Sequence, residues 1–291
     1  MNTAQGGQLP TVVVPVFNAF RALVECLDAL AIHSPDARIV FIDDGSDDAR
    51  IAPLLAHWTA SRPATRVITL PENLGFVHAA NRGMAAEAAV GHDVILLNSD
   101  TVVTGGWLAA MARCLASASN VATATPWSNN AEIVSVPRFC AVNPVPEQPE
   151  RWARAARSST TGRYPELPTA VGFCMGISRR AIGELGLFDE AAFGRGYGEE
   201  NDFSCRATAA GWRNVLCEDA YVVHQGGQSF GPLGLKPGEH SMRRLLDKHP
   251  NYLEQISAWI EADPLADRRQ ALLNALEAGA SGTLKRPQAR D

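Results

Sequence analysis

The eight residues DVILLNSD, which run from Asp93 to Asp100, indicate how this chain folds. Residues 94–97 form a continuous apolar run, which is typical of a strand buried on both faces of a parallel sheet. The run then ends abruptly in three polar residues. Because open α/β folds bind ligands at the carboxyl edge of their strands, we expect Asp100 to lie fixed at that edge and to face a cationic group. The alternative is a strand that ends in an ordinary Asn-Ser-Asp turn, and these eight residues alone favour neither interpretation.

The first half of the chain alternates short apolar runs with amphipathic ones. We predict strands over residues 11–17, 38–42, 66–70 and 93–97, and helices over residues 20–31, around residues 54–58 and over residues 76–89. Pro15 marks the place where the first strand leaves the sheet, because proline cannot donate to a central ladder. This alternation predicts an α/β fold with a doubly wound, mixed but mostly parallel sheet flanked by helices.

The pattern changes in the second half. Residues 125–168 are rich in Pro, Ser and Asn, so we expect long loops with an antiparallel excursion there. We predict strands over residues 171–178 and 215–223 and helices over residues 179–185, 199–210 and 239–278, the last of them broken at Pro250. The predicted organisation is a flexible N-terminus (residues 1–10), one α/β domain (11–235), a helical C-terminal extension (236–278) and a disordered tail (279–291).

The composition excludes several classes of protein. Of the 291 residues, 46% are hydrophobic and 20% are charged, which is ordinary for a globular protein. The net charge of −5 makes a nucleic-acid partner unexpected. The chain has no apolar run of the roughly 18 residues that span a membrane, and its first ten residues do not resemble a secretory signal. The six cysteines form no CxxC pair and are expected to be reduced, buried thiols of a cytoplasmic protein.

Carboxylates follow several of the predicted parallel strands. Asp43 and Asp44 come after the second strand and Asp100 after the fourth, so they are expected along one edge of the sheet. Such a cluster without nearby cations usually serves a hard metal ion or donors on a ligand. The chain has neither GxGxxG nor GxxxxGK[ST], which counts against a dinucleotide dehydrogenase and a P-loop enzyme. A phosphate ligand at this edge would therefore need a bridging metal.

A second acidic cluster opens the predicted helix at residue 199. Glu199, Glu200 and Asp202 follow a glycine-rich loop over residues 194–198, and crowded carboxyl groups raise the pKa of one another, which suits a general base. The alternative is that these acids complement the helix dipole, which is worth roughly 0.3–1 kcal/mol each. His224 ends a predicted strand. A lone histidine is more often structural than a ligand, but His224 could complete a metal site with Asp100.

Six motifs together resemble a known family. They are VVVPVFNA, FIDDGSDD, NLGFVHAANRG, ILLNSD, GEENDFSCRA and VVHQGGQSF. In this order and at these spacings, from about residue 11 to residue 230, they resemble family 2 of the inverting nucleotide-sugar glycosyltransferases, which has the GT-A fold. The SNN at residues 128–130 and the HxGGxSF ending are similar to bacterial cell-surface glycan transferases, often rhamnosyl- or O-antigen transferases.

The resemblance implies a role for each residue that matches a motif. The nucleobase would be held by Pro15 and Asp44, and further donor contacts would come from Asn18, Asn81 and Ser99. Mg²⁺ or Mn²⁺ would be held by Asp100 and His224. The catalytic base would be Glu200, with Glu199 beside it. Two positions depart from the family pattern: Asn98 replaces the first acid of the D-x-D motif, and Glu200 stands where the base is usually Asp.

The function implied by the resemblance is inverting, metal-dependent transfer of a sugar from a nucleotide sugar, most often a UDP- or dTDP-sugar. The acceptor would be a hydroxyl of a bacterial surface glycan or a lipid-linked acceptor. Two alternatives stay open. A nucleotidyltransferase is expected to carry a glycine-rich basic loop near the first strand, which the sequence lacks. A non-catalytic glycan- or nucleotide-binding module would not need the acids and the histidine described above.

A basic segment without acids covers residues 151–163. It contains Arg151, Trp152, Arg154 and Arg157. A solvated basic face is the favoured interpretation, by about two to one. The alternative is peripheral contact with an anionic membrane or with a lipid-diphosphate acceptor at the inner face of the cytoplasmic membrane, with help from residues 236–249.

Overall fold

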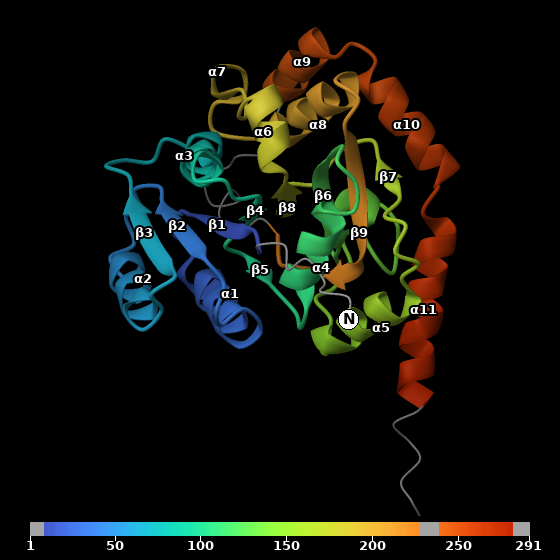
Figure 1. Ribbon diagram of the computed structural model, residues 1–291, viewed down its shortest axis with the longest axis horizontal. Coiled ribbons are helices and arrows are strands. Elements are labelled where there is room, and N and C mark those ends of the chain that lie inside the picture. Colours follow the sequence, from blue (N-terminus) through green and yellow to red (C-terminus); the bar gives the residue numbers. More distant parts are fainter. Residues whose placement is uncertain (1–8, 227–238, 282–291) are drawn as a thin grey trace, which may run out of the picture.

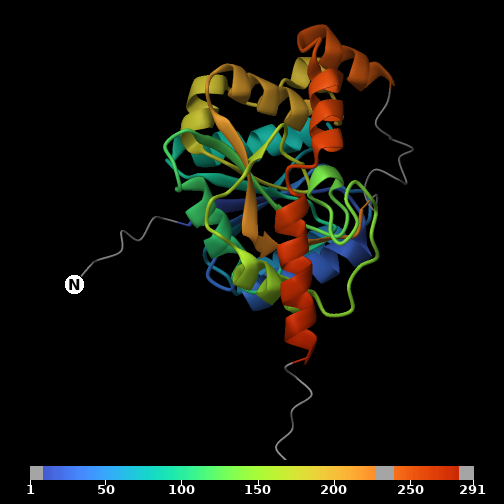
Figure 2. The same cartoon turned by 90° about the vertical axis from the view of Figure 1, so that its right-hand side faces the viewer.

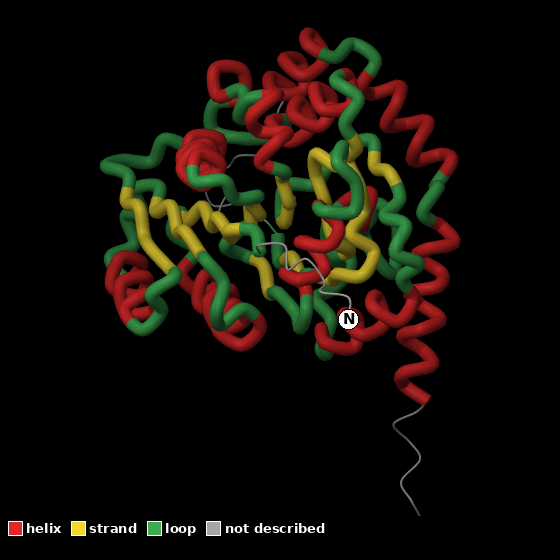
Figure 3. The backbone as a smooth tube through the Cα atoms, in the orientation of Figure 1, coloured by secondary structure: helices red, strands yellow, loops and turns green. Residues whose placement is uncertain are grey.

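The computed structural model describes residues 9–226 and 239–281. Its centre is an eight-stranded mixed sheet in the order β3-β2-β1-β4-β8-β6-β9-β7, with helices on both faces (Figures 1 and 3). The prediction of a mixed, mostly parallel sheet flanked by helices is confirmed. The predictions for residues 1–8 and 282–291 and for the domain boundary between residues 235 and 236 lie outside the described residues. Residues 279–281, where the disordered tail was predicted to begin, are helical instead.

The first half folds as the alternation of apolar and amphipathic runs predicts. The strands of this half are β1 (Thr11–Val16), β2 (Ile39–Asp43), β3 (Thr65–Thr69) and β4 (Val94–Leu97), which pair in parallel. The helices between them are α1 (Phe20–His33), α2 (Ile51–Ala60) and α3 (Phe76–Ala89). β1 pairs with β4 only as far as Val13, whereas it pairs with β2 as far as Val16. Pro15 therefore lies beyond the ladder with β4, where no amide hydrogen is needed.

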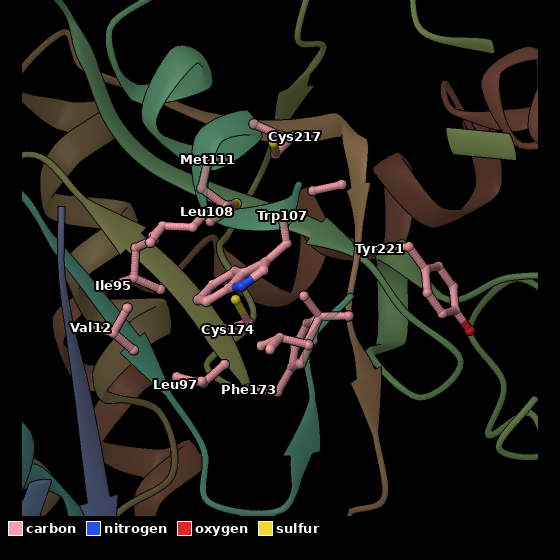
Figure 4. Close-up of a cluster of buried hydrophobic side chains, with 14 of the residues drawn as sticks. Val12, Ile95, Leu97, Trp107, Leu108, Met111, Phe173, Cys174, Cys217 and Tyr221 are labelled. Atoms are coloured by element: carbon pink, nitrogen blue, oxygen red, sulfur yellow. The ribbon is translucent and has the colours of Figure 1, made fainter. Parts of the chain in front are cut away.

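β4 is buried on both of its faces, as its apolar run predicts. Ile95 and Leu97 pack into the hydrophobic cluster on one side of the sheet, while Val94 and Leu96 pack into the cluster on the other side. Figure 4 shows the first cluster, in which Trp107 fills the space over β4. Because both faces of β4 are closely packed, the strand cannot shift along its own axis. The position of the polar residues that follow it is therefore fixed as well.

The second half adds strands of both directions. β8 (Cys174–Ile177) runs antiparallel between β4 and β6 (Val121–Trp127), β9 (Arg213–Tyr221) is parallel to β6, and β7 (Glu166–Leu167) is antiparallel to β9 at the edge. A separate two-stranded sheet pairs β5 (Thr101–Val102) with β10 (Val223–His224). The remaining elements of this half are α4 (Trp107–Leu115), the short 3₁₀-helix η1 (Glu132–Val134), α5 (Pro149–Ser159), α6 (Arg179–Leu185), α7 (Glu190–Phe193) and α8 (Glu199–Ala209).

The expectation of loops over residues 125–168 was wrong in two places. β6 extends to Trp127, although Pro126 and two threonines interrupt its apolar pattern. α5 buries only the small side chains of Ala153, Ala155 and Ala156, which give a weak hydrophobic period. The predicted antiparallel excursion is confirmed in β7.

Three helices follow at the C-terminal end of the described chain. They are α9 (Glu239–Lys248), α10 (Tyr252–Ala262) and α11 (Ala266–Ser281). The predicted break at Pro250 is confirmed, and a second break lies at Asp263, whose φ of 38° ends α10. Figure 2 shows α11 running down the molecule past α5. Within residues 9–226 and 239–281, no helix is long and apolar enough to cross a bilayer.

Candidate active site

His224 and Asp100 meet at the end of β4. Antiparallel pairing of β5 with β10 places His224 opposite Thr101, next to Asp100 in the chain. The Nε2 atom of His224 lies 3.5 Å from Oδ1 of Asp100, and the amide of Gln225 donates to the carbonyl of Asp100 at 3.0 Å. The proximity on which the sequence-based metal site depends is therefore present.

The imidazole of His224 is held on several sides. Its Nδ1 atom lies 2.6 Å from the carbonyl oxygen of Asn130, and its amide donates to Oδ1 of Asn129 at 2.9 Å. The ring of Phe173 stacks on it with 5.2 Å between centroids. Burial lowers the pKa of His224, but the hydrogen bond and charge of Asp100 more than offset this, so the net shift is upward. Both asparagines belong to the SNN triplet, which sequence analysis noted without assigning a role.

Asp100 and His224 suit a divalent cation that a bound ligand helps to coordinate. The bond to Asn130 puts the hydrogen of a neutral imidazole on Nδ1 and leaves the lone pair of Nε2 directed at Asp100, which is how metal-binding histidines are usually oriented. The carboxylate suits Mg²⁺ or Mn²⁺, and the imidazole nitrogen is a ligand more typical of a transition metal ion, which favours Mn²⁺ of the two. No group of three or more His, Cys, Asp or Glu side chains within the described ranges is placed to hold a metal.

Glu200 is linked to this pair through one short segment. A methyl group added to Gly172 would lie 3.8 Å from Cγ of Glu200, so the glutamate side chain lies over that glycine. The next residue, Phe173, stacks on His224, and its carbonyl accepts a hydrogen bond from the amide of Asn98 at 2.9 Å. The segment before β8 thus connects the start of α8 with the end of β4.

The two glutamates that begin α8 differ in their titration. Burial raises the pKa of Glu200 to about 7. Burial, followed by the charge of Glu200, raises the pKa of Glu199 well above its usual range, and Glu199 is only 4% exposed. Among the described residues, neither Oε2 atom has a hydrogen-bond partner. Glu199 is thus expected to stay protonated near neutral pH, while Glu200 titrates in the range that suits a general base.

The carboxylate of Asp44, the residue after β2, binds the turn that precedes α3. Its two oxygens accept hydrogen bonds from the amides of Leu74 and Gly75, both at 2.8 Å, and the side chain is 3% exposed. Burial raises its pKa, although both amides oppose the shift. Asn18 acts in the neighbouring loop, where its Oδ1 accepts from the amides of Asp47 and Asp48 at 3.1 and 3.0 Å.

The other predicted donor contacts are spread over the same half. Pro15 lies within β1, opposite Ile42. Ser99 is buried between β4 and Asp100. The amide of Asn81 both donates to and accepts from the backbone of Phe188, at 3.0 Å each, so this side chain joins α3 to the segment before α7.

The glycine-rich loop before α8 is docked rather than open. The carbonyl of Arg195 accepts from the amide of Phe76 at 3.2 Å, and its guanidinium donates to the side chain and carbonyl of Asn73. Tyr197 has a φ of 73°, a costly conformation for a bulky residue. Burial, then the charges of Glu199, Glu200 and Asp100, raise the pKa of Tyr197. Sequence analysis identified the loop but neither Arg195 nor Tyr197.

Asp202 anchors α8 to the end of α9. Its side chain is fully buried and pairs with Arg206 at 2.8 Å, Lys248 at 2.8 Å and His249 at 2.9 Å. Lys248 also pairs with Asp189 at the start of α7, at 2.6 Å. Sequence analysis missed this network, because its members come from segments that are distant in the chain.

Most of the basic segment at α5 is bound within the protein. Trp152 stacks on Tyr221 with 5.4 Å between ring centroids. Arg151 donates to the carbonyl of Leu276, and Arg157 donates to the carbonyl of Gly105. Arg154 is exposed.

Comparison with protein-family models gives a match over the first two thirds of the chain. The family model of glycosyl transferase family 2 matches residues 11–186, which include Asp44 and Asp100 but end before Glu200 and His224. Comparison with curated protein sequences gives no match.

Solved structures of glycosyltransferases share the fold. GalNAc-T7 with UDP, GalNAc and Mn²⁺ has a TM-score of 0.61 at 16% identity; the alignment covers 93% of this chain but only 55% of GalNAc-T7. A mannosyltransferase from Pyrobaculum calidifontis with GDP-Man and Mn²⁺ has a TM-score of 0.54 at 17% identity, covering 94% of this chain and 76% of the other. TarS from S. aureus with UDP-GlcNAc has a TM-score of 0.54 at 15% identity, covering 91% and 78%. These likenesses show the GT-A fold that the motifs imply.

Proposed function

Since this chain belongs to glycosyl transferase family 2, we propose that it is a glycosyltransferase that transfers a sugar from a nucleotide sugar to an acceptor hydroxyl with inversion. We propose a bacterial surface glycan or a lipid-linked saccharide as the acceptor. The observation that carries the proposal is the link between Glu200 and the Asp100–His224 pair through residues 172 and 173. A base and a pair of metal-binding groups at one sheet edge are what such a transfer requires.

Glu200 would act as the general base. Its carboxylate removes the proton from the acceptor hydroxyl while the acceptor oxygen forms a bond to the anomeric carbon. The bond from that carbon to the nucleoside diphosphate breaks on the opposite face, so the configuration inverts. A protonated Glu199 is uncharged, so it does not repel a negative charge on Glu200, and Glu200 can ionise near neutral pH.

Asp100 and His224 would hold Mg²⁺ or Mn²⁺. When bound, this ion supplies positive charge that offsets the charge of the nucleoside diphosphate. The bond from His224 to Asn130 keeps the imidazole oriented for that role. Asn98 stands in place of the family's first acid and offers an uncharged amide where that acid would give a third ligand, a carboxylate. We therefore expect the affinity of the site for the metal to depend more strongly on the phosphates of the bound donor.

The donor is proposed to be a UDP- or dTDP-sugar. GalNAc-T7 and TarS were solved with UDP or UDP-GlcNAc, which supports a uridine nucleotide, while the Pyrobaculum calidifontis mannosyltransferase was solved with GDP-Man. Pro15, Asp44 and Asn18 are proposed to shape the nucleoside end of the site. The backbone amides that donate to Asp44 and Asn81 indicate that these two side chains support the surrounding loops as well.

A donor screen tests the proposal. Thermal shift with UDP-, GDP- and dTDP-sugars, each with and without Mn²⁺, should show stabilisation by one nucleotide class that increases with Mn²⁺. Release of the nucleoside diphosphate is then measured with the stabilising donor. Binding of no nucleotide sugar, or release of pyrophosphate from a nucleoside triphosphate and a sugar phosphate, would contradict the proposal; the second result would identify a nucleotidyltransferase.

Cytoplasmic location and peripheral membrane contact stay predictions. Of the four residues predicted for that contact, Arg154 is exposed, whereas Arg151, Trp152 and Arg157 make the internal contacts described above. Co-sedimentation with anionic vesicles at low and high salt measures the contact directly.

A further inference from the structure

A cavity lies beside α8, the helix that begins with Glu199 and Glu200. It has a volume of about 830 Å³, within the roughly 300–1,000 Å³ typical of ligand pockets. Its walls come from α8, from the β7–β9 edge of the sheet and from α10, which lie close together at the upper right of Figure 1. Trp212, Tyr252 and Trp259 supply aromatic walls.

The cavity and the proposed base share one helix. Cys205, Thr208 and Ala209 line the cavity at positions i, i+3 and i+4, so they lie on one side of α8. One turn earlier, Asn201 lies on that side, and Glu200 lies about 100° round the helix from it. Burial, then the charge of Glu200, raise the pKa of Tyr252. The cavity therefore begins at Cys205, a little more than one turn of α8 beyond Glu200.

The charged groups of the cavity are already paired. Lys248 binds Asp189 and Asp202 at 2.6 and 2.8 Å. Arg213 binds Glu166 at 2.6 Å. A phosphate or carboxylate ligand would have to compete with these pairs for a cation. The charge distribution thus favours an uncharged occupant over a nucleotide or a lipid phosphate.

The remaining lining suits a saccharide. A pyranose ring has apolar C–H faces that pack on aromatic rings, and its hydroxyl groups bond to amide side chains. Trp259 is half-buried and offers such a ring, while Asn251 and Gln255 are exposed along the same helix. Each amide side chain has both a donor and an acceptor, as a sugar hydroxyl does.

We propose that this cavity binds an uncharged saccharide segment of the acceptor. The proposal rests on the proposed glycosyl transfer and adds the chemical class of its acceptor. The segment next to the reacting sugar would lie between Trp259 and Tyr252, which leaves the acceptor hydroxyl on the Glu200 side of the cavity.

Binding is measured on the full chain with four trisaccharides as probes. Maltotriose, mannotriose and N-acetylchitotriose are uncharged, and trigalacturonate is anionic. Saturation-transfer NMR and quenching of tryptophan fluorescence report binding without turnover. Trp259→Ala and Gln255→Ala change the cavity. Leu253→Ala is the control, because Leu253 lies on the same helix, is 46% exposed and does not line the cavity.

We expect saturable binding of at least one uncharged trisaccharide, weakened about tenfold by Trp259→Ala and less by Gln255→Ala, and unchanged by Leu253→Ala. No binding of any uncharged probe, equal binding by both cavity variants and the wild type, or preference for trigalacturonate would overturn the inference. Because Gln255 is exposed, its variant gives a result even if Trp259→Ala fails to fold. Calorimetry with the nucleotide sugar and Mn²⁺ is a separate arm: donor binding without saccharide binding refutes only this inference, whereas saccharide binding without donor binding refutes the proposed function.

Discussion

The Nε2 atom of His224 lies 3.5 Å from Oδ1 of Asp100, although the two residues belong to opposite halves of the chain. The short antiparallel pair of β5 and β10 creates this contact, because it sets His224 opposite the residue that follows Asp100. The contact places an imidazole nitrogen beside a carboxylate at the carboxyl edge of the parallel strands. Donor binding should therefore depend on both side chains and on a metal.

Replacing either member of the pair should remove the metal dependence of donor binding. For His224→Ala and Asp100→Ala we expect affinity for the nucleotide sugar in Mn²⁺ to fall by more than about tenfold, to the value measured with EDTA. Calorimetry with and without Mn²⁺ measures the difference. His57→Ala, at an exposed position on α2, should bind like the wild type. Mn²⁺-dependent binding that persists in both site variants would contradict the assignment.

The pH dependence of transfer should follow Glu200. Because burial raises its pKa to about 7, the carboxylate form is lost as the pH falls below about 7. We expect kcat to fall about tenfold per pH unit on that acidic side and to level off above it. A pH profile of kcat, measured with saturating donor, reports this limb. A rate that stays constant down to pH 5 would show that Glu200 is not the base.

The same shift affects stability. The pKa of Glu200 is higher in the folded chain than its ordinary value of 4.5, so the free energy of unfolding should decrease as the pH rises from about 4.5 to about 7. Glu200→Gln should lack this contribution and be more stable than the wild type at pH 8, but not at pH 4. Urea unfolding at both values tests the difference, and equal stability of the two proteins at pH 8 would argue against a desolvated Glu200.

Gly75 should tolerate no side chain. Its φ is +100°, and an added Cβ would lie 2.7 Å from Cα of Arg195 in the docked glycine loop. We expect Gly75→Ala to lose about 1–3 kcal/mol of stability and to lower turnover by displacing that loop. Gly183→Ala is the matched control: it lies in α6 with nothing within 4 Å, and should gain about 0.5–1 kcal/mol. Chemical unfolding of both variants measures the contrast, and an equal effect at the two positions would contradict the docking.

Lys248 should hold α9 against α8. Its loss leaves the buried carboxylate of Asp202 with Arg206 and His249 alone. We expect Lys248→Met to lose about 1–2 kcal/mol, a figure reduced for the partial exposure of the lysine, and to speed amide exchange in α9. Hydrogen exchange read by mass spectrometry tests this, with Arg243→Met at an exposed position of α9 as control. Unchanged exchange in Lys248→Met would show that α9 is held by its apolar contacts instead.

Secondary structure could be predicted from the sequence where it depends mainly on the residues of the segment itself. The run from Val94 to Leu97 could be recognised as a doubly buried strand because every residue in it is apolar, and its polar end then located the site. α5 could not be recognised in this way, since the face it buries consists of alanines that contrast little with their neighbours.

The candidate site shows the same limit. Asp100, Glu200 and His224 lie at the ends of elements, where a sequence pattern changes visibly. The roles of Asn130, which orients His224, and of Asp202, which ties α8 to α9, arise from contacts between distant segments. No local pattern encodes such contacts, so only the folded chain shows them.

The central claim is that Glu200 is the base of a glycosyl transfer, and Glu200→Gln tests it most directly. The measurement is release of the nucleoside diphosphate and formation of glycosylated acceptor, beside calorimetry of the donor, with Glu184→Gln at an exposed position of α6 as control. We expect Glu200→Gln to lose at least about a hundredfold in turnover while it binds the donor like the wild type, and Glu184→Gln to match the wild type in both. Turnover by Glu200→Gln at the wild-type rate would contradict the claim.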